Sequence, residues 1–306
     1  MLEGTKTKYI CASDRQRRMI AYFENEGESV SSVVPFPVNT EIFKFSATSR
    51  AQVRKRLGIS SDKKLLLYTG RLSLQKCIIR LLEEFHQLVR EGNHDLCLAL
   101  AGPYDDLGGM TSNIRIPVSY YFHQVQEKLR SLPKKIQEKI FFLGDLEVKD
   151  LTQIYSAADL FVSISLHHDE DYGMCPGEAL SSGLPCILTD WGGYPGFQKG
   201  GLPVELIPVA LGKRGLEIDS NILKQLLRAG IQNLSTPAQR KKTGAVFAKN
   251  FGIHAVAEQL KASFCDEEFK ATGKFRWTLE VVARNGSLTG DLYKEVYGQY
   301  VHQSAN

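Results

Sequence analysis

The sequence predicts an α/β protein built on a doubly wound parallel sheet. From Lys63 onward, short apolar runs of strand length alternate with longer segments of helical periodicity, as in parallel strands joined by crossover helices. The apolar runs are nearly continuous, which is expected for strands that are covered on both faces. The predicted strands of this sheet are Leu65–Tyr68, Leu96–Ala101, Ile140–Leu143, Leu160–Ile164, Cys186–Thr189 and Leu206–Val209.

The predicted helices lie between these strands and after the last one. They are Cys77–Glu91, Tyr120–Arg130, Lys149–Ala157, a short helix beginning at Pro176, Asn221–Ala229, Pro237–Lys249 and Ile253–Phe264. Before the sheet, the pattern predicts strands at Lys8–Ala12 and Ser31–Val38, with a helix at Asp14–Phe23 between them. The 306 residues suffice for one large or two modest domains.

Composition and charge exclude several classes of protein. No apolar run is long enough to span a bilayer and no secretory leader pattern begins the chain. We therefore expect a cytoplasmic protein, with at most a peripheral position at the inner face of a membrane. The net charge of +4 is spread along the chain and gives no indication of nucleic-acid binding. The six cysteines form no CxxC pair, which favours reduced, buried thiols over a zinc site or a disulfide framework.

The stretch from Phe161 to Gly193 carries the densest pattern of chemistry-bearing residues. It predicts a buried strand, a loop with charge and glycine, a short helix, a second strand and a glycine turn. Pro176 suits the first helical turn, where its missing N–H costs nothing, so Glu178 is expected in that turn. Gly173 and the residues after it then direct free backbone N–H groups to the space above the strand ends. This arrangement predicts an anion-binding site.

The same stretch resembles the donor-site signature of glycosyltransferase family 4, which are retaining enzymes of the GT-B fold. In that signature a Glu, seven residues and a second Glu follow a strand and precede a helix of small residues, as Glu170 and Glu178 do here. Two acids at one spacing are a weak signal by themselves. The similarity extends further along the stretch, to Ala179, Gly183, Pro185, Thr189, Asp190, Gly192 and Gly193. The resemblance implies the C-terminal half of a GT-B fold.

The resemblance also implies roles for several side chains. Arg71 and Lys76, which follow Gly70 after the first strand of the sheet, would offset the charge on the donor diphosphate as the sugar–phosphate bond breaks. They would thereby do without a metal what Mg²⁺ does elsewhere, so no metal or other cofactor is expected. Glu170 would bind hydroxyl groups of the transferred sugar. Glu178 would accept hydrogen bonds from the ribose hydroxyls of the donor.

Backbone groups would make the remaining donor contacts that the resemblance implies. Gly173 and Met174 would approach the sugar and phosphates with their N–H groups, because a residue without a side chain permits the closest approach. Two further places are implied, namely the end of the third strand, whose backbone would meet the nucleobase, and the glycine turn after the fifth strand. Their residues are Leu143, Gly144, Gly192 and Gly193.

Each side chain also has a purely structural interpretation. Arg71 and Lys76 alone would indicate a solvated turn, because most lysines and arginines are surface residues. Glu178 alone would be a helix-start acid that interacts with the helix dipole. Glu170 alone would be a loop acid. Because Asp169 and Asp171 flank it, three consecutive acids compete for the position of the first Glu of the signature. The histidines at 167–168 point different ways as neighbours in an extended segment, so they are not expected to bind a metal.

The resemblance also implies a domain division. Pro35–Phe43 is similar to the connector between the two domains of that family. Residues 1–50 would then be a remnant of the N-terminal acceptor domain with its connector, and residues 51–264 the nucleotide-sugar-binding Rossmann-like domain. Residues 265–306 would be a C-terminal extension that is helical in part. On this interpretation most of the acceptor-binding half is missing.

Three functions compete. The resemblance favours a retaining glycosyltransferase, or its donor-binding half, that moves a hexose from a UDP-, GDP- or ADP-linked sugar to a saccharide or lipid-linked acceptor. A second candidate is a non-catalytic nucleotide-sugar-binding module, or a fragment that needs an N-terminal-domain partner chain or a second copy of itself. A third is a glycoside hydrolase with Glu170 and Glu178 as acid and base, which is disfavoured because an Arg–Lys pair suits a diphosphate. Nucleotide, sugar, acceptor and linkage stay open.

Overall fold

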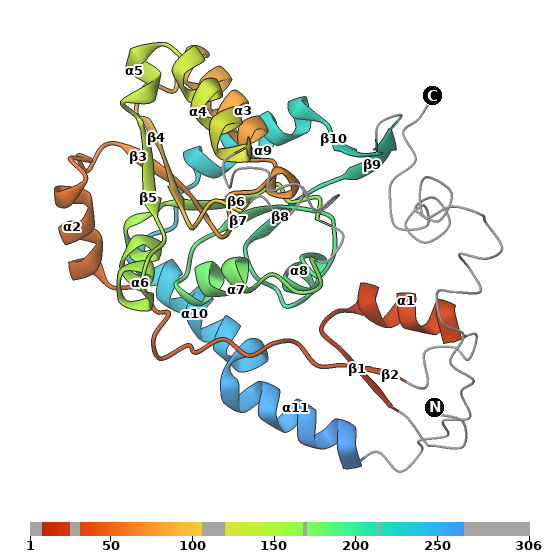
Figure 1. Cartoon of the computed structure of the whole chain (residues 1–306). Coiled ribbons are helices and arrows are strands. Elements are labelled where there is room, and N and C mark those ends of the chain that lie inside the picture. Colours follow the sequence, from red (N-terminus) through yellow and green to blue (C-terminus); the bar gives the residue numbers. More distant parts are fainter. Residues whose placement is uncertain (1–7, 25–30, 106–119, 168–169, 213–214, 266–306) are drawn as a thin grey trace.

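The predicted doubly wound parallel sheet is confirmed in the computed structural model, which describes residues 8–24, 31–105, 120–167, 170–212 and 215–265 (Figure 1). Six strands pair in the order β5-β4-β3-β6-β7-β8, and every neighbouring pair is parallel. The strands are β3 (Lys64–Thr69), β4 (Leu96–Ala101), β5 (Ile140–Gly144), β6 (Leu160–Ser163), β7 (Cys186–Thr189) and β8 (Val204–Ile207). The order reverses between β3 and β6, and ligands of such sheets bind beyond the carboxyl ends of the strands at that point.

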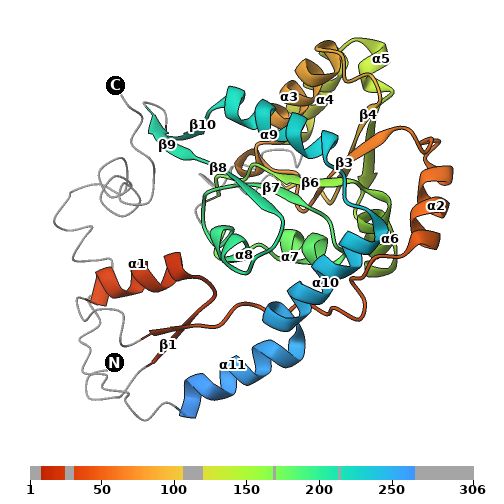
Figure 2. The same ribbon diagram turned by 180° about the vertical axis from the view of Figure 1, so that it is seen from behind.

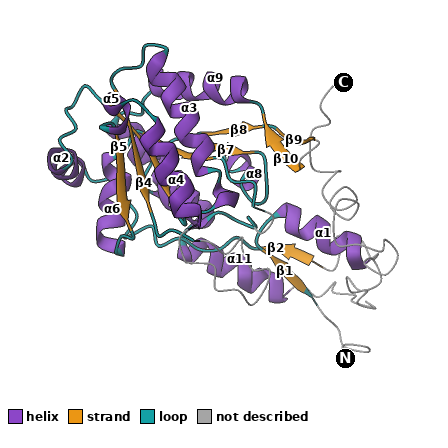
Figure 3. Cartoon of the chain, turned by 45° about the horizontal axis from the view of Figure 1, so that its top comes forward, coloured by secondary structure: helices purple, strands orange, loops and turns teal. Residues whose placement is uncertain are grey.

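Helices cover both faces of this sheet (Figure 3). Leu66 and Tyr68 of β3 point into one core, whereas Leu65 and Leu67 point into the other. Burying one such leucine contributes about 1.5 to 3 kcal/mol, which explains why the strands are apolar on both sides. The helices of the first core are α3 (Ile78–Arg90), α4 (Tyr120–Ser131) and α9 (Ser220–Gln232); those of the second are α6 (Val148–Ala157), α7 (Met174–Ser181), α8 (Pro195–Lys199) and α10 (Pro237–Phe251).

Some helices of the sheet domain have no counterpart in the sequence-based expectation, and the longest of them has ten residues. Helix α2 (Ala47–Arg56) buries only Val53 and Arg54, so it has no apolar stripe that periodicity could detect. It is held instead by Asp159, whose carboxylate lies 2.5 Å from Nη2 of Arg50 and 3.2 Å from Nη1 of Arg54. The expected domain boundary at residue 50 falls inside this helix.

A small N-terminal unit packs against the same domain. Strands β1 (Tyr9–Cys11) and β2 (Ser31–Val33) form a parallel pair joined by helix α1 (Asp14–Glu24). Strand β2 ends before the predicted Val38, because the prolines at 35 and 37 cannot donate ladder hydrogen bonds. Helix α11 (Ile253–Cys265) continues from α10 and runs beside this unit (Figure 2).

The remaining described elements are short. They are η2 (Leu74–Lys76), α5 (Lys134–Gln137), β9 (Val209–Gly212) and β10 (Gly215–Ile218), the last two forming an antiparallel hairpin. The predicted strand Leu206–Val209 covers the end of β8 and the start of β9. Residues 106–119 and nearly all of the predicted C-terminal extension lie outside the described residues. None of the described helices is both long and apolar enough to cross a membrane.

Candidate functional site

A cavity of about 470 Å³ opens at the carboxyl ends of β3 and β6, where the strand order reverses. This volume lies within the range of roughly 300 to 1,000 Å³ that small-molecule sites occupy. Six of the residues singled out from the sequence line it, from three separate segments of the chain: Gly70, Arg71, Lys76, Glu170, Gly173 and Met174. Tyr68, Thr69, Tyr172 and Tyr194 also line it; the sequence pattern had placed Tyr68 in a strand and had singled out none of the four as a site residue.

Lys76 and Glu170 form an ion pair in this cavity. The Nζ of Lys76 donates a hydrogen bond to Oε2 of Glu170, and the two side chains are only 15% and 11% exposed. Removing one partner of a buried ion pair strongly destabilises the folded protein, because the remaining charge is left uncompensated. Each of these two groups therefore holds the other in place. The Lys76 ammonium has three donors and Glu170 has a second oxygen, so both retain capacity for a ligand.

The backbone around Lys76 explains its position. Lys76 ends the single turn of η2, and Cys77 after it adopts a left-handed φ of +55°, which is uncommon for a residue other than glycine. The N–H of Leu166, in the loop after β6, donates to the carbonyl of Gln75 at 3.1 Å. This bond ties the turn to the loop that carries Glu170.

Gly192 and Gly193 support the Glu170 loop. Gly192 has a φ of +58°, and a Cβ there would lie 1.8 Å from the carbonyl oxygen of Glu170. A Cβ on Gly193 would lie 2.3 Å from the carbonyl oxygen of Asp171, and the N–H of Gly193 donates to the Glu170 carbonyl at 2.7 Å. The absence of side chains at both positions is therefore needed for packing against this loop.

Helix α7 begins two residues earlier than the sequence indicated. Gly173 caps it with a φ of +99°, where a Cβ would lie 2.5 Å from the ring of Tyr194. The first helical bond runs from Gly177 N–H to the Gly173 carbonyl, so the N–H groups of Met174 and Cys175 have no partner within the helix. These groups lie at the cavity wall, where the positive end of the helix favours an anion.

Glu178 is the fifth residue of α7 and not in its first turn as predicted. Its Oε2 accepts a hydrogen bond from the Tyr155 hydroxyl at 2.8 Å, and that hydroxyl lies 2.6 Å from Oγ1 of Thr69, a residue that lines the cavity. Burial raises the pKa of Glu178 to about 7, although the Tyr155 hydrogen bond acts in the opposite direction. Tyr155 was missed because one tyrosine on an amphipathic helix indicates only a core position.

The other predicted residues lie at the edge of this arrangement. Arg71 is half-exposed at the cavity and pairs with Asp105, with 2.6 Å between Nη1 and Oδ2. Leu143 and Gly144 end β5, and the Gly144 carbonyl accepts a hydrogen bond from Gly102 N–H at 2.7 Å. They are separated from β3 by β4 and do not line the cavity.

Potential metal ligands do not gather in the part of the chain that the structure describes. No three His, Cys, Asp or Glu side chains converge there in a way that could hold an ion. His167 is placed by its carbonyl, which accepts a hydrogen bond from Trp191 Nε1 at 2.7 Å, whereas His168 lies outside the described residues. Cys11, Cys77, Cys97, Cys175 and Cys186 are free thiols, and the first, third and fifth of these are buried.

The family model for glycosyl transferases group 1 matches residues 49–201, which is half of the chain and includes every predicted site residue. The chain belongs to this family. Mannosylfructose-phosphate synthase of Agrobacterium fabrum is 33% identical over 156 residues, 51% of this chain and 31% of that protein. D-inositol 3-phosphate glycosyltransferase of Corynebacterium diphtheriae is 26% identical over 81% of this chain and 53% of that protein. The matched part thus spans a third to a half of these relatives.

Solved structures of glycosyltransferases share the fold of this group 1 family member. Anabaena HepE in complex with UDP and glucose has a TM-score of 0.63 and 16% identity, over 85% of this chain and 63% of that one. The C-terminal domain of the Francisella tularensis group 1 glycosyltransferase LpcC has a TM-score of 0.52 and 17% identity, over 71% of this chain and 99% of that domain. Together they identify the sheet domain as one half of a GT-B architecture.

Proposed function

We propose that this glycosyltransferase domain binds a nucleoside-diphosphate sugar in the cavity between β3 and β6. The observation that carries the proposal is the Lys76–Glu170 pair, a cation beside a carboxylate at the switch point of the sheet. Met174 and Cys175 at the start of α7 line the same cavity, and their N–H groups, which have no partner within the helix, suit a diphosphate. The UDP and UDP-glucose complexes of HepE support a ligand of this class.

In this proposal the cations act on the diphosphate. Lys76 and Arg71 offset the negative charge that develops on the diphosphate when its bond to the sugar breaks, so no metal is required. Glu170 hydrogen-bonds the hydroxyls of the transferred hexose. Glu178, which lies outside the cavity lining, accepts from ribose hydroxyls that extend beyond it, in its ionised form and held by Tyr155. Leu143 and Gly144 would meet the nucleobase with their backbone.

We propose further that the complete reaction is a retaining hexosyl transfer of the family 4 type to a saccharide or lipid-linked acceptor. Such transfer needs the acceptor hydroxyl positioned beside the anomeric carbon, and this alignment supplies roughly 7 to 11 kcal/mol of barrier reduction. The acceptor wall would come from an N-terminal domain, a partner chain or a second copy of this chain. Without it, the domain acts as a nucleotide-sugar-binding module.

A glycoside hydrolase is the weaker alternative. A hydrolase of that kind needs two carboxyl groups that flank one glycosidic bond. Glu170 lines the cavity but is paired with Lys76, and Glu178 is bound to Tyr155 and does not line it. Hydrolysis of an aryl glycoside without any nucleotide would revive this candidate.

The experiment that tests the proposal compares UDP with uridine by calorimetry, in wild-type protein and in Lys76→Met. GDP and ADP with their nucleosides should be run in parallel because the nucleotide is open. Loss of a charged hydrogen bond should weaken diphosphate binding by about 1.5 to 3 kcal/mol. Nucleoside binding should change little, because the nucleoside carries no phosphate.

Lys128→Met is the matched control. Lys128 of α4 pairs with Glu83 of α3 and lies outside the cavity. It should bind UDP as wild-type protein does. Equal losses for UDP and uridine in Lys76→Met would show that the variant merely disturbs the fold. Unchanged UDP affinity would contradict the proposed role of Lys76.

A further inference from the structure

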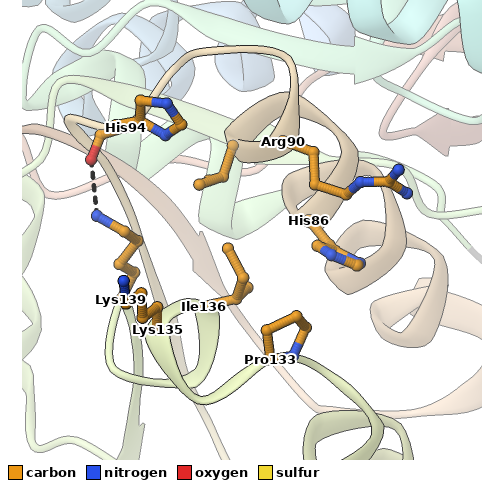
Figure 4. A pocket seen from close by; sticks show the side chains of 8 residues that line it. His86, Arg90, His94, Pro133, Lys135, Ile136 and Lys139 are labelled. Carbon is orange, nitrogen blue, oxygen red and sulfur yellow. Dashed lines mark hydrogen bonds between the residues drawn. The ribbon is translucent and has the colours of Figure 1, made fainter.

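A second cavity lies at the opposite edge of the sheet. It has a volume of about 730 Å³ and lies between the end of α3, the loop before β4, and α5 (Figure 4). His94 precedes β4 and Lys139 precedes β5, so the cavity is at the amino ends of these strands. Because a strand of six residues spans about 20 Å, this cavity is separate from the one beside Lys76.

The polar wall of this cavity is basic. Five of the eight lining side chains are basic, and none of those described there is acidic: His86, Arg90, His94, Lys135 and Lys139. Lys139, directly before β5, donates to the His94 carbonyl at 2.6 Å, which joins the loop before β4 to the segment between α5 and β5. Neither Arg90 nor Lys135 makes an ion pair within the described residues. Their charges are therefore available to a ligand.

Three acids on the neighbouring elements are already paired with cations from outside the cavity. Glu83 pairs with Lys128 of α4, and Glu91 pairs with Arg228 of α9. Asp95, directly before β4, lies 2.9 Å from Nζ of Lys64. These pairs leave the cavity with an excess of positive charge.

The surroundings of His86 are also positively charged. Its Nε2 is buried and has no hydrogen-bond partner, which is uncommon for a buried polar atom. Burial lowers the pKa of His86, and the positive charges of Arg90 and Lys128 lower it further. An anion in the cavity would offset this charge and offer an acceptor to Nε2 when that nitrogen carries a proton.

The floor of the cavity is apolar. Val89, Pro133 and Ile136 form it, and Figure 4 shows the Ile136 side chain directed into the hollow with His94 and His86 on opposite sides. A concave apolar floor with a few convergent cations is typical of a ligand site, whereas a solvated charged surface has no such floor.

We propose that this cavity binds a phosphate-bearing anion, with Arg90 and Lys135 as the main charged contacts and the body of the ligand against Ile136. Arg90 offers a planar fork that matches two phosphate oxygens, and Lys135 adds a point charge. The phosphate belongs to a free metabolite or to a lipid headgroup, which share this chemistry. The site does not depend on the function proposed for the cavity beside Lys76.

The test follows the histidine side-chain resonances by NMR while inorganic pyrophosphate is added to the full chain. His86 and His94 should shift, and they are assigned with the variants His86→Gln and His94→Gln. No described residue lining the cavity beside Lys76 is a histidine, so pyrophosphate bound there would not move these signals directly. The double variant Arg90→Gln/Lys135→Gln should bind pyrophosphate at least about tenfold more weakly at the His86 signal.

A matched control removes the same charge elsewhere. Lys241→Gln/Lys242→Gln changes two exposed lysines of α10 and should leave the His86 response intact. Co-sedimentation with phosphatidylglycerol vesicles, against neutral phosphatidylcholine vesicles, identifies the lipid source if it depends on Arg90 and Lys135. Pyrophosphate shifts without vesicle binding identify a free phosphate compound. No response to either probe, or an equal loss in both double variants, would overturn the proposal.

Discussion

The hydroxyl of Tyr155 donates a hydrogen bond of 2.8 Å to the carboxylate of Glu178, and the two residues come from different helices, α6 and α7. The same hydroxyl lies 2.6 Å from Thr69 at the end of β3, so a fully buried tyrosine connects the central strand to the proposed ribose-binding acid. Tyr155 is therefore a positioning residue, since it acts through Glu178.

Tyr155→Phe should weaken UDP binding mainly at neutral pH. The hydrogen bond favours the ionised carboxylate, so its removal raises the pKa of Glu178 above about 7 and reduces the ionised fraction. UDP affinity measured by calorimetry between about pH 6 and pH 9 should reach its plateau at higher pH in the variant. Tyr121→Phe, on α4 in the other core, is the control and should not move the profile. An unshifted profile would limit Tyr155 to a packing role.

Glu178→Gln should affect binding and stability in opposite directions. The loss of a charged acceptor should weaken UDP binding by about 1 to 3 kcal/mol. In the unliganded protein, however, the raised pKa means that ionised Glu178 destabilises the fold. The stability that the protonated form contributes is fully present below pH 4.5 and is lost as the pH rises through about 7.

The Gln variant should therefore unfold at a higher urea concentration than wild-type protein at alkaline pH, by a free energy on the order of 3 kcal/mol. The difference should shrink as the pH falls toward the ordinary value of a glutamic acid. Urea titrations at several pH values check this. A variant that is less stable at alkaline pH would show that the carboxylate is compensated in the unliganded protein.

Gly192→Ala should disturb the Glu170 loop beyond the backbone cost of the substitution. Gly192 and Gly201 have similar positive φ angles, +58° and +70°, and an alanine in such a conformation costs about 1 to 2 kcal/mol at either position. Only at Gly192 would the new Cβ meet a backbone atom, the Glu170 carbonyl, since Gly201 has nothing within 4 Å. Gly192→Ala should lose more unfolding free energy than Gly201→Ala, and it alone should lose UDP affinity. Equal losses in the two variants would mean that the Glu170 loop shifts to accommodate the new Cβ at little cost.

Asp159→Asn should destabilise the protein strongly. Its carboxylate accepts from Arg50 and Arg54 and from the backbone N–H of Leu65, and the variant leaves the buried Arg54 charge uncompensated. Breaking such a buried pair costs about 3 to 5 kcal/mol, toward the lower end here because Asn keeps one oxygen.

Asp150→Asn is the control for this change. Asp150 also pairs with an arginine of α2, Arg56, but both side chains are largely exposed, so the expected loss is about 0 to 1 kcal/mol. The measurement is the midpoint of urea unfolding. Equal midpoints for the two variants would show that α2 does not depend on the buried network.

Local patterns in the sequence determined the sheet and much of the site. Continuous apolar runs separated by helical periodicity specify parallel strands buried on both faces, because each strand must cover two cores. The stretch around Glu170 was recognisable from the order of its residues alone. Helix α2 was not, since ion pairs with Asp159 hold it in place of an apolar stripe.

Only the tertiary structure decided which side chains meet. Lys76 and Glu170 are 94 positions apart and form a pair because β3 and β6 are neighbours at the switch point, and this order follows from packing across the whole sheet. The Tyr155–Glu178 contact and the packing of Gly192 on the Glu170 carbonyl likewise join distant segments. Sequence spacing carries information over a few residues, whereas a strand order depends on long-range contacts that no local pattern encodes.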